Sequence, residues 1–285
     1  MRIALASLVA VFVLTGFSAA APRPFEVTKL PEPRWSRTGP VPRGDANVKL
    51  VLVSSVGNAI TDVGNWFRRH GLRLREHRLP GGLEPDFPLY ALPAGTPVSF
   101  RGARLVRSVR QSGTQLGFYG RNFAEARYVL ARRGGRALYG FDFANYAHLP
   151  KALSGPGGSV YQSATWAVEA RGALYVSHSH AGFARDSSGL NGFVTAIDLR
   201  TRKVLWRSRS LVANAYTFEV VGNVIVTGYG FAEEPDYLYL LDRRTGGVLQ
   251  RLRVPTAPEY LIRRGRTLFV RTYDRDLVVR LSESA

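Results

Sequence analysis

Two stretches of the sequence decide its fold: TAIDLRTRKVLW at residues 195–206 and LYLLDRRTGGVLQ at residues 238–250. The two stretches match in pattern, and their aspartates, Asp198 and Asp242, stand 44 residues apart. A supersecondary unit that repeats at this period, in a sequence rich in short β runs, is typical of the blades of a β-propeller. The repeat indicates the architecture of the protein but gives almost no information about its activity.

Further short β runs begin at glycine-containing turns elsewhere in the chain. Their starting points are Gly102, Gly135, Gly172, Gly222 and Gly265, which are separated by 33, 37, 50 and 43 residues. This spacing is uneven, but it clusters around the length of a four-stranded blade. The sequence therefore predicts an all-β fold, a β-propeller of about five to six four-stranded blades.

The order of strands can be predicted within the blade that contains the second stretch. We expect an inner strand at 215–222, then strands at 223–230 and 237–246, and an outer strand at 247–254. In the Asp-x-x-Thr-Gly turn between the last two, polar side chains bond nearby backbone and glycine permits a positive φ. In the first stretch Arg202 replaces this glycine, so we expect that turn to be strained or of another type.

The turn and the strand after it resemble the PQQ-like propeller repeat. The residues that carry the resemblance are Asp198, Thr201, Lys203 and Trp206 in one blade, Asp242, Thr245 and Gly246 in the next with Gln250 in place of tryptophan, and a degenerate trace at 91–98. The resemblance implies a propeller over two clear blades. Quinoprotein dehydrogenases of this type use more blades, and many have an adjacent-cysteine disulfide over the quinone. This chain is short and has no cysteine, so we expect no cofactor.

Both ends of the domain are expected to meet in one blade. The chain ends with DLVVRLSESA at 276–285, which matches a third strand with no outer strand after it. A propeller closes its ring by borrowing the missing strand from the other terminus, which also removes exposed strand edges. The expected donor is VKLVLVSS at 48–55.

The propeller, expected at 48–285, is preceded by two segments of different composition. Residues 1–20 have a basic start, an apolar run and a small-residue exit, which is the pattern of a secretory signal peptide. Residues 21–47 are a proline-rich leader, expected to be extended and pinned to the domain by Phe25 and Trp35. We therefore expect a secreted or periplasmic monomer that spans no membrane after cleavage.

Residues 57–80 are compatible with two structures. VGNAITDVG at 56–64 matches the blade start VGNVIVTGYG, whereas Ile60, Val63 and Phe67 fall at helical spacing. We favour a short N-terminal helix packed on the ring over a further blade start.

The charge balance is strongly basic. The chain has 39 Lys and Arg against 21 Asp and Glu, a formal net charge of +18. Such a field favours anionic partners such as an acidic polysaccharide. The alternative is that the arginines are spread over a solvated surface.

The absence of cysteine excludes disulfides and thiolate chemistry. No nucleic-acid-binding motif occurs, and export argues against a nucleic-acid partner.

Candidate functional residues gather where the second strands of the blades end. Equivalent strand ends lie on one face of a propeller, around its central funnel, so we expect these side chains to converge. The binding candidates are Asp142, His178, His180, Arg185, Tyr229, Tyr273 and Asp274, and the catalytic candidates are His178, His180, Tyr229 and Tyr273.

His178 and His180 are the most specific pair among these candidates. Residues two apart on a strand share a face, so both imidazoles could meet one ion with Asp142 or Asp274 as a third ligand. The alternative is two polar histidines at a wet loop edge. Because no spacing fixes the third ligand, we expect no metal site. The nearby loop acids Glu233, Glu234 and Asp236 are interpreted as solvated charges rather than calcium ligands.

Two classes of function remain open on the sequence. The favoured hypothesis is a non-catalytic binding or scaffold module that engages an envelope protein or an anionic polymer. The alternative is a hydrolase or lyase that acts on an acidic carbohydrate in the funnel, with a histidine or tyrosine moving the proton. An enzyme should gather His178, a tyrosine and a carboxylate in a deep funnel, whereas a scaffold should leave them scattered.

Overall fold

The computed structural model describes residues 25–44, 48–70, 96–154 and 160–283. The predicted signal peptide at 1–20 and most of the degenerate repeat trace at 91–98 lie outside the described residues. No helix in the described ranges combines the length and the apolar character that crossing a bilayer requires.

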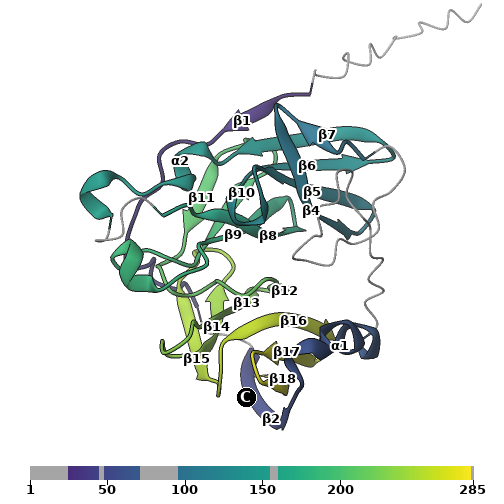
Figure 1. Cartoon of the computed structure of the whole chain (residues 1–285), viewed down its shortest axis with the longest axis vertical. Helices are drawn as coiled ribbons and strands as arrows, with labels where there is room; N and C mark the ends of the chain where they lie inside the picture. Colours follow the sequence, from purple (N-terminus) through teal and green to yellow (C-terminus); the bar gives the residue numbers. More distant parts are fainter. Residues whose placement is uncertain (1–24, 45–47, 71–95, 155–159, 284–285) are drawn as a thin grey trace, which may run out of the picture.

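The strands of the described residues assemble into four sheets, and apart from β2, which joins the fourth sheet, each sheet is built from strands that are consecutive or nearly so in the chain (Figure 1). The first sheet has six strands, in the order β1 (Val27–Lys29), β7 (Arg136–Asp142), β6 (Ala126–Arg133), β5 (Thr114–Gly120), β4 (Ala103–Gln111) and β3 (Ser99–Phe100). The second sheet contains β8 (Ser163–Ala170), β9 (Ala173–Ser179), β10 (Phe193–Asp198) and β11 (Val204–Arg207). The third contains β12 (Glu219–Val221), β13 (Val224–Tyr229), β14 (Tyr237–Asp242) and β15 (Val248–Arg253). The fourth contains β16 (Pro258–Arg264), β17 (Thr267–Thr272), β18 (Arg275–Glu283) and β2 (Val48–Gly57).

The predicted β-propeller class and its four-stranded antiparallel units are confirmed. The five predicted starting points each open a strand, namely β4, β7, β9, β13 and β17. Two of these strands, β4 and β7, belong to the same sheet because β5 pairs with β6, with Gly117 opposite Leu130. The described residues therefore form four sheets, where five or six blades were expected.

The third sheet has the predicted strand order, and its repeat turn shows why the two stretches match. Gly246 has a φ of +76°, and Arg202, at the same place in the second sheet, has a φ of +62°. Both turns therefore use the left-handed region, where a residue other than glycine is strained by about 1–2 kcal/mol. Asp198 helps to hold the strained turn, because its Oδ1 accepts a 2.6 Å hydrogen bond from the Thr201 amide.

The predicted closure by the N-terminal donor strand is confirmed. β2 pairs antiparallel with β18 over its full length, from Val48 opposite Glu283 to Gly57 opposite Arg275. Leu50 of β2 is only 3% exposed and joins the apolar core shared by the third and fourth sheets. A second apolar core lies between the first and second sheets and reaches the third.

The leader is extended and contacts each sheet in turn. β1 pairs parallel with β7 of the first sheet, and Trp35 packs edge-on against Phe193 of the second, with ring centroids 5.8 Å apart. The Arg43 amide donates a 2.6 Å hydrogen bond to Asp242 Oδ2 of the third sheet. The leader then enters β2 in the fourth sheet, so β1 and β2 lie at opposite ends of the molecule (Figure 1).

Within the described part of 57–80, residues 60–69 are helical, as favoured from the sequence. A 3-10 turn, η1 (Ile60–Asp62), leads into the helix α1 (Val63–Arg69). Trp66 and Phe67 are both 1% exposed and pack against Tyr260 and Ile262 of β16. Shorter helical turns lie in the connections between strands: α2 (Ala144–Ala147), η2 (Phe123–Glu125), η3 (Lys151–Leu153) and η4 (Ala184–Ser187).

Candidate functional site

A pocket of about 620 Å³ lies between the four sheets, where several connecting loops meet. Phe123 of η2 lines it from the first sheet, and His180, just after β9, lines it from the second. The third sheet contributes Asp236, which precedes β14. The fourth sheet contributes Glu259 of β16 and Tyr273, which follows β17. This pocket corresponds to the funnel expected at the strand ends.

His178 does not reach the pocket. It is fully buried in β9, and its ring lies 4.8 Å from Phe143 and 5.3 Å from Tyr146, measured between centroids. Neither ring nitrogen has a hydrogen-bond partner among the described residues. Burial, together with the nearby charge of Arg207, lowers the pKa of His178 well below its ordinary value. His178 is therefore a neutral core residue.

His180 does line the pocket, with 5% of its surface exposed. Its Nε2 lies 2.9 Å from Ser187 Oγ, and its backbone amide donates to Asn191 Oδ1 at 2.9 Å. Burial lowers the pKa of His180 to about 4, although the nearby Asp186 acts in the opposite direction. The two histidines thus have different surroundings, and the described residues contain no group of three His, Asp or Glu side chains placed to hold a metal ion.

Asp142 is engaged within the first sheet. Arg127 of β6 donates to it from Nε at 2.7 Å and from Nη2 at 2.8 Å, and the Ala144 amide donates at 2.9 Å. Burial alone would raise the pKa of Asp142, but these hydrogen bonds hold it below its ordinary value. The carboxylate caps the turn that leads into α2 and does not line the pocket.

Tyr229 and Arg185 are also held by local partners. The Tyr229 hydroxyl donates a 2.7 Å hydrogen bond to Glu234 Oε2, and burial raises the pKa of the phenol. The guanidinium carbon of Arg185 lies 4.5 Å from the centroid of the Phe183 ring. Neither side chain lines the pocket, although Gly230, next to Tyr229, does.

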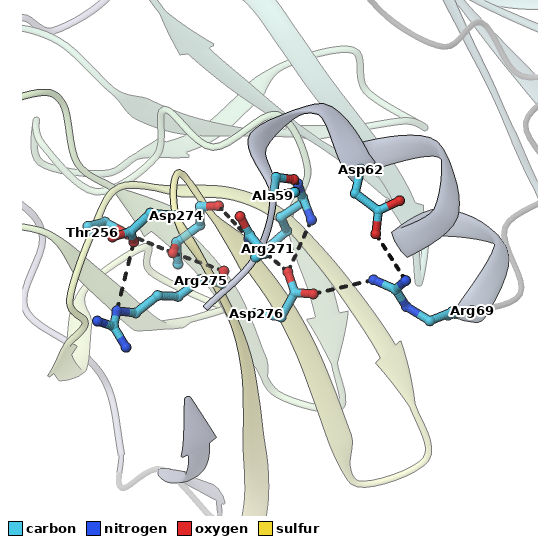
Figure 2. Close-up of polar contacts among 10 residues, drawn as sticks. Ala59, Asp62, Arg69, Thr256, Arg271, Asp274, Arg275 and Asp276 are labelled. Atoms are coloured by element: carbon cyan, nitrogen blue, oxygen red, sulfur yellow. Dashed lines mark hydrogen bonds and ion pairs between the residues drawn. The ribbon is translucent and has the colours of Figure 1, made fainter. Parts of the chain in front are cut away.

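Tyr273 and Asp274 lie at the rim of the pocket, on the turn between β17 and β18. Tyr273 is 55% exposed and lines the pocket. Asp274 Oδ1 accepts a 2.6 Å hydrogen bond from Thr256 Oγ1, another lining residue, and pairs with Arg275 at 3.9 Å (Figure 2).

A second set of polar contacts fixes the rim to the N-terminal helix (Figure 2). The buried Arg271 donates to the Ala59 carbonyl at 2.6 Å and to Asp276 Oδ1 at 3.2 Å. Arg69 of α1 pairs with both Asp276 and Asp62, at 3.5 and 3.1 Å. These contacts hold α1 beside the turn that carries Tyr273.

Two carboxylates line the pocket that the sequence did not single out as site residues. Asp236 was interpreted as a solvated loop charge, but burial raises its pKa to about 6. Glu259 lies on β16, and burial raises its pKa as well. The only signal in the sequence was an acidic residue inside the inner strand PEYLIRR at 258–264, and this strand has no apolar–polar alternation that would show which face meets the pocket.

The likeness of this chain to known proteins lies in its fold. No family model matches the sequence, and no curated protein matches it. Among solved structures, the chain is similar to PQQ-like β-propellers at low sequence identity. One is BamB from Moraxella catarrhalis, with 12% identity and a TM-score of 0.41 over 62% of this chain and 44% of that one, so the match spans less than half of BamB. Another is the quinohemoprotein alcohol dehydrogenase ADHIIG from Pseudomonas putida HK5, with 14% identity and a TM-score of 0.35 over 57% of this chain and 27% of that one. The computationally designed Ika4 protein matches with 10% identity and a TM-score of 0.40, over 65% of this chain and 96% of its own.

Proposed function

We propose that this protein is a non-catalytic binding module of the cell envelope, which holds a segment of a partner protein in its central pocket. The observation that supports it is the scattering of the predicted proton-transfer residues. His178 is enclosed by aromatic rings, and the Tyr229 hydroxyl is bonded to Glu234. Only His180 and Tyr273 of the catalytic candidates line the pocket.

The lining of the pocket favours a protein over an acidic polymer. Among the described residues that line it, none is lysine or arginine, whereas Asp236 and Glu259 are carboxylic acids. A uronate chain would bring like charges against these two carboxylates, which is unfavourable. Its size of about 620 Å³ suits a few side chains of an inserted loop.

Site-specific photo-crosslinking in cells tests this proposal. Tyr273 would be replaced by the crosslinking amino acid p-benzoylphenylalanine, and Leu205 would serve as the matched control. Both side chains are 55% exposed, but Leu205 lies on β11, an outer strand away from the pocket. We expect a discrete protein adduct from position 273 and none from position 205.

Two results would overturn the proposal. One is the same pattern of adducts from positions 273 and 205. The other is turnover of a uronate polymer by the purified protein, provided that Asp236→Asn or His180→Ala abolishes it. That second result would support the lyase or hydrolase alternative in the same pocket.

A further inference from the structure

We infer that the central pocket recognises a basic side chain, a lysine or an arginine, which the partner protein inserts between Asp236 and the aromatic residues of the lining. This inference rests on the proposed function and names the chemistry of its ligand. It is carried by the hydrogen-bonding state of the lining, by the aromatic side chains around it and by the distribution of charge.

The first observation is an unsatisfied acceptor at Asp236. Its Oδ1 is buried and accepts no hydrogen bond within the described part of the chain. Glycine at position 230 makes room for this carboxylate, because a Cβ there would overlap Asp236 Oδ1 and the Ala257 backbone. The positive charge of Arg253 lowers the pKa of Asp236, but burial raises this pKa by a larger amount. Asp236 itself lines the pocket, so a ligand that donates to its carboxylate would relieve the cost of the missing hydrogen bond.

The second observation concerns His180, a lining side chain that is 95% buried. Its Nε2 and the Ser187 hydroxyl form a 2.9 Å hydrogen bond, in which the donor depends on the tautomer of the ring. Its Nδ1 has no hydrogen-bond partner in the described ranges. The described part of the lining therefore contains one carboxylate oxygen and one ring nitrogen without partners, on Asp236 and His180.

The third observation is the aromatic part of the lining. Phe123, Tyr216, Phe231 and Tyr273 come from the first, third and fourth sheets and all line the pocket. An aromatic face attracts a lysine ammonium or an arginine guanidinium when the cation lies over the ring. Carboxylates and aromatic faces together distinguish a basic side chain from a neutral donor such as serine or glutamine.

The distribution of charge explains why the expected ligand is a basic side chain of a partner protein and not a small free cation. The chain as a whole has a net charge of +18, so its long-range field repels small free cations. A partner with an otherwise acidic surface is attracted by that field and can still present one lysine or arginine. The acidic pocket within a basic molecule would then fix the position at which the partner binds.

Short capped peptides test the inference on the full chain. The probes are acetyl-Gly-Arg-Gly-amide and acetyl-Gly-Lys-Gly-amide, with the citrulline analogue as the uncharged match for arginine and a glutamate analogue as the anionic control. Binding is followed by ligand-observed NMR titration. We expect the arginine and lysine peptides to bind at least about tenfold more tightly than the citrulline and glutamate peptides, which corresponds to ~1.4 kcal/mol.

Variants of the protein assign the effect to the pocket. Asp236→Asn and Glu259→Gln keep the shapes of the side chains, and we expect Asp236→Asn to reduce binding of the arginine peptide about tenfold. Glu233→Gln removes the same charge from the neighbouring loop, where Glu233 is exposed and does not line the pocket. We expect this control to change binding by less than about twofold. Circular dichroism confirms that each variant is folded.

The outcomes distinguish a failure of the inference about the basic side chain from a failure of the proposed function. Equal binding of the arginine and citrulline peptides, no binding of either basic peptide, or equal effects of Asp236→Asn and Glu233→Gln would each overturn the inference. The photo-crosslink at position 273 tests the proposed function separately. If that crosslink is found while the peptides fail to discriminate charge, the binding module stands and the basic side chain is excluded.

Discussion

The indole Nε1 of Trp206 donates a 3.1 Å hydrogen bond to the backbone carbonyl of Arg243. This bond joins β11, the outer strand of the second sheet, to the repeat turn of the third sheet. Gln250 occupies the equivalent position in the next repeat and exchanges two hydrogen bonds with the Leu50 backbone of β2, at 2.9 and 3.1 Å. The last position of the repeat therefore links the second sheet to the third through tryptophan and the third sheet to the fourth through glutamine.

The packing of Trp206 predicts a large effect of Gly246→Ala. A Cβ at position 246 would overlap the Trp206 ring, in addition to the strain of a positive φ. Gly265→Ala is the matched control, because Gly265 also has a positive φ but nothing lies within 4 Å of its added Cβ. We expect Gly265→Ala to cost about 1–2 kcal/mol of unfolding free energy and Gly246→Ala to cost about 1–3 kcal/mol more. Urea denaturation measures both, and equal losses would contradict the contact.

The closure strand predicts a contrast between two positions of β2. Leu50→Ala empties a core position that is 3% exposed, so we expect a loss of about 2–4 kcal/mol. Val53 lies on the same strand but is 51% exposed, so Val53→Ala should change stability by less than about 0.5 kcal/mol. If both variants unfolded at the same urea concentration as the parent protein, β2 would not be closing the fourth sheet in solution.

Glu219 predicts a specific dependence of stability on pH. Burial raises its pKa in the folded protein to about 7, from an ordinary value of 4.5. Between these pH values the folded state keeps a proton that the unfolded state releases, so the contribution of Glu219 to stability falls as pH rises. The full effect is at most about 3 kcal/mol.

Glu219→Gln tests this dependence, because glutamine can still accept the hydrogen bond from the Arg263 amide. We expect the variant and the parent protein to be equally stable at pH 4 to 4.5, and the variant to be the more stable above about pH 7. Thermal melts over this range provide the measurement. Parallel stability curves for the two proteins would show that Glu219 has an ordinary pKa.

We expect that replacing Arg207 with an apolar residue stabilises the folded protein. Its guanidinium nitrogens are buried with no hydrogen-bond partner in the described residues, and burial lowers its pKa to about 9. The rings of Trp35, Tyr146 and Phe193 surround it at 3.9–4.9 Å and recover only part of this cost. We expect Arg207→Met to raise the unfolding free energy by about 1–3 kcal/mol.

The control for Arg207 is Arg209→Met, two residues further along the chain, where the arginine side chain is exposed. This variant should lie within about 0.5 kcal/mol of the parent protein. A loss of stability in Arg207→Met that exceeds the loss in Arg209→Met would mean that the aromatic rings more than compensate for the buried charge. Differential scanning calorimetry distinguishes these results.

The sequence predicted the parts of the fold that depend on local pattern. Glycine turns located the five strand starts, and the unpaired last strand located its partner at Val48–Gly57. The described residues form four sheets where about five to six blades were expected, because pairing between neighbouring hairpins leaves no local signal in the sequence. The β5–β6 pair that joins two starting points into one sheet is an example.

The candidate site was less predictable, and His178 shows the reason. Strand alternation placed His178 and His180 on one face, but β9 ends at Ser179 and all its residues are buried. His178 is therefore covered on its side of the strand, and His180 lies where the alternation no longer holds. Asp142 does not line the pocket because it accepts hydrogen bonds from Arg127, a partner that no sequence spacing indicates. Glu259 was missed because burial, which raises its pKa, depends on the other sheets.

The route of the leader has a consequence for the order in which the protein can fold. The leader and β2 are synthesised before the parts of the protein that they contact. The leader contacts β7, Phe193 and Asp242, β2 pairs with β18, and these partners follow one another in that order along the chain. The N-terminal segment can thus be fixed only stepwise, and its last step waits for the final strand of the chain. A chain interrupted before residue 275 would leave β2 without its partner, so the fourth sheet can be completed only after β18 has been synthesised.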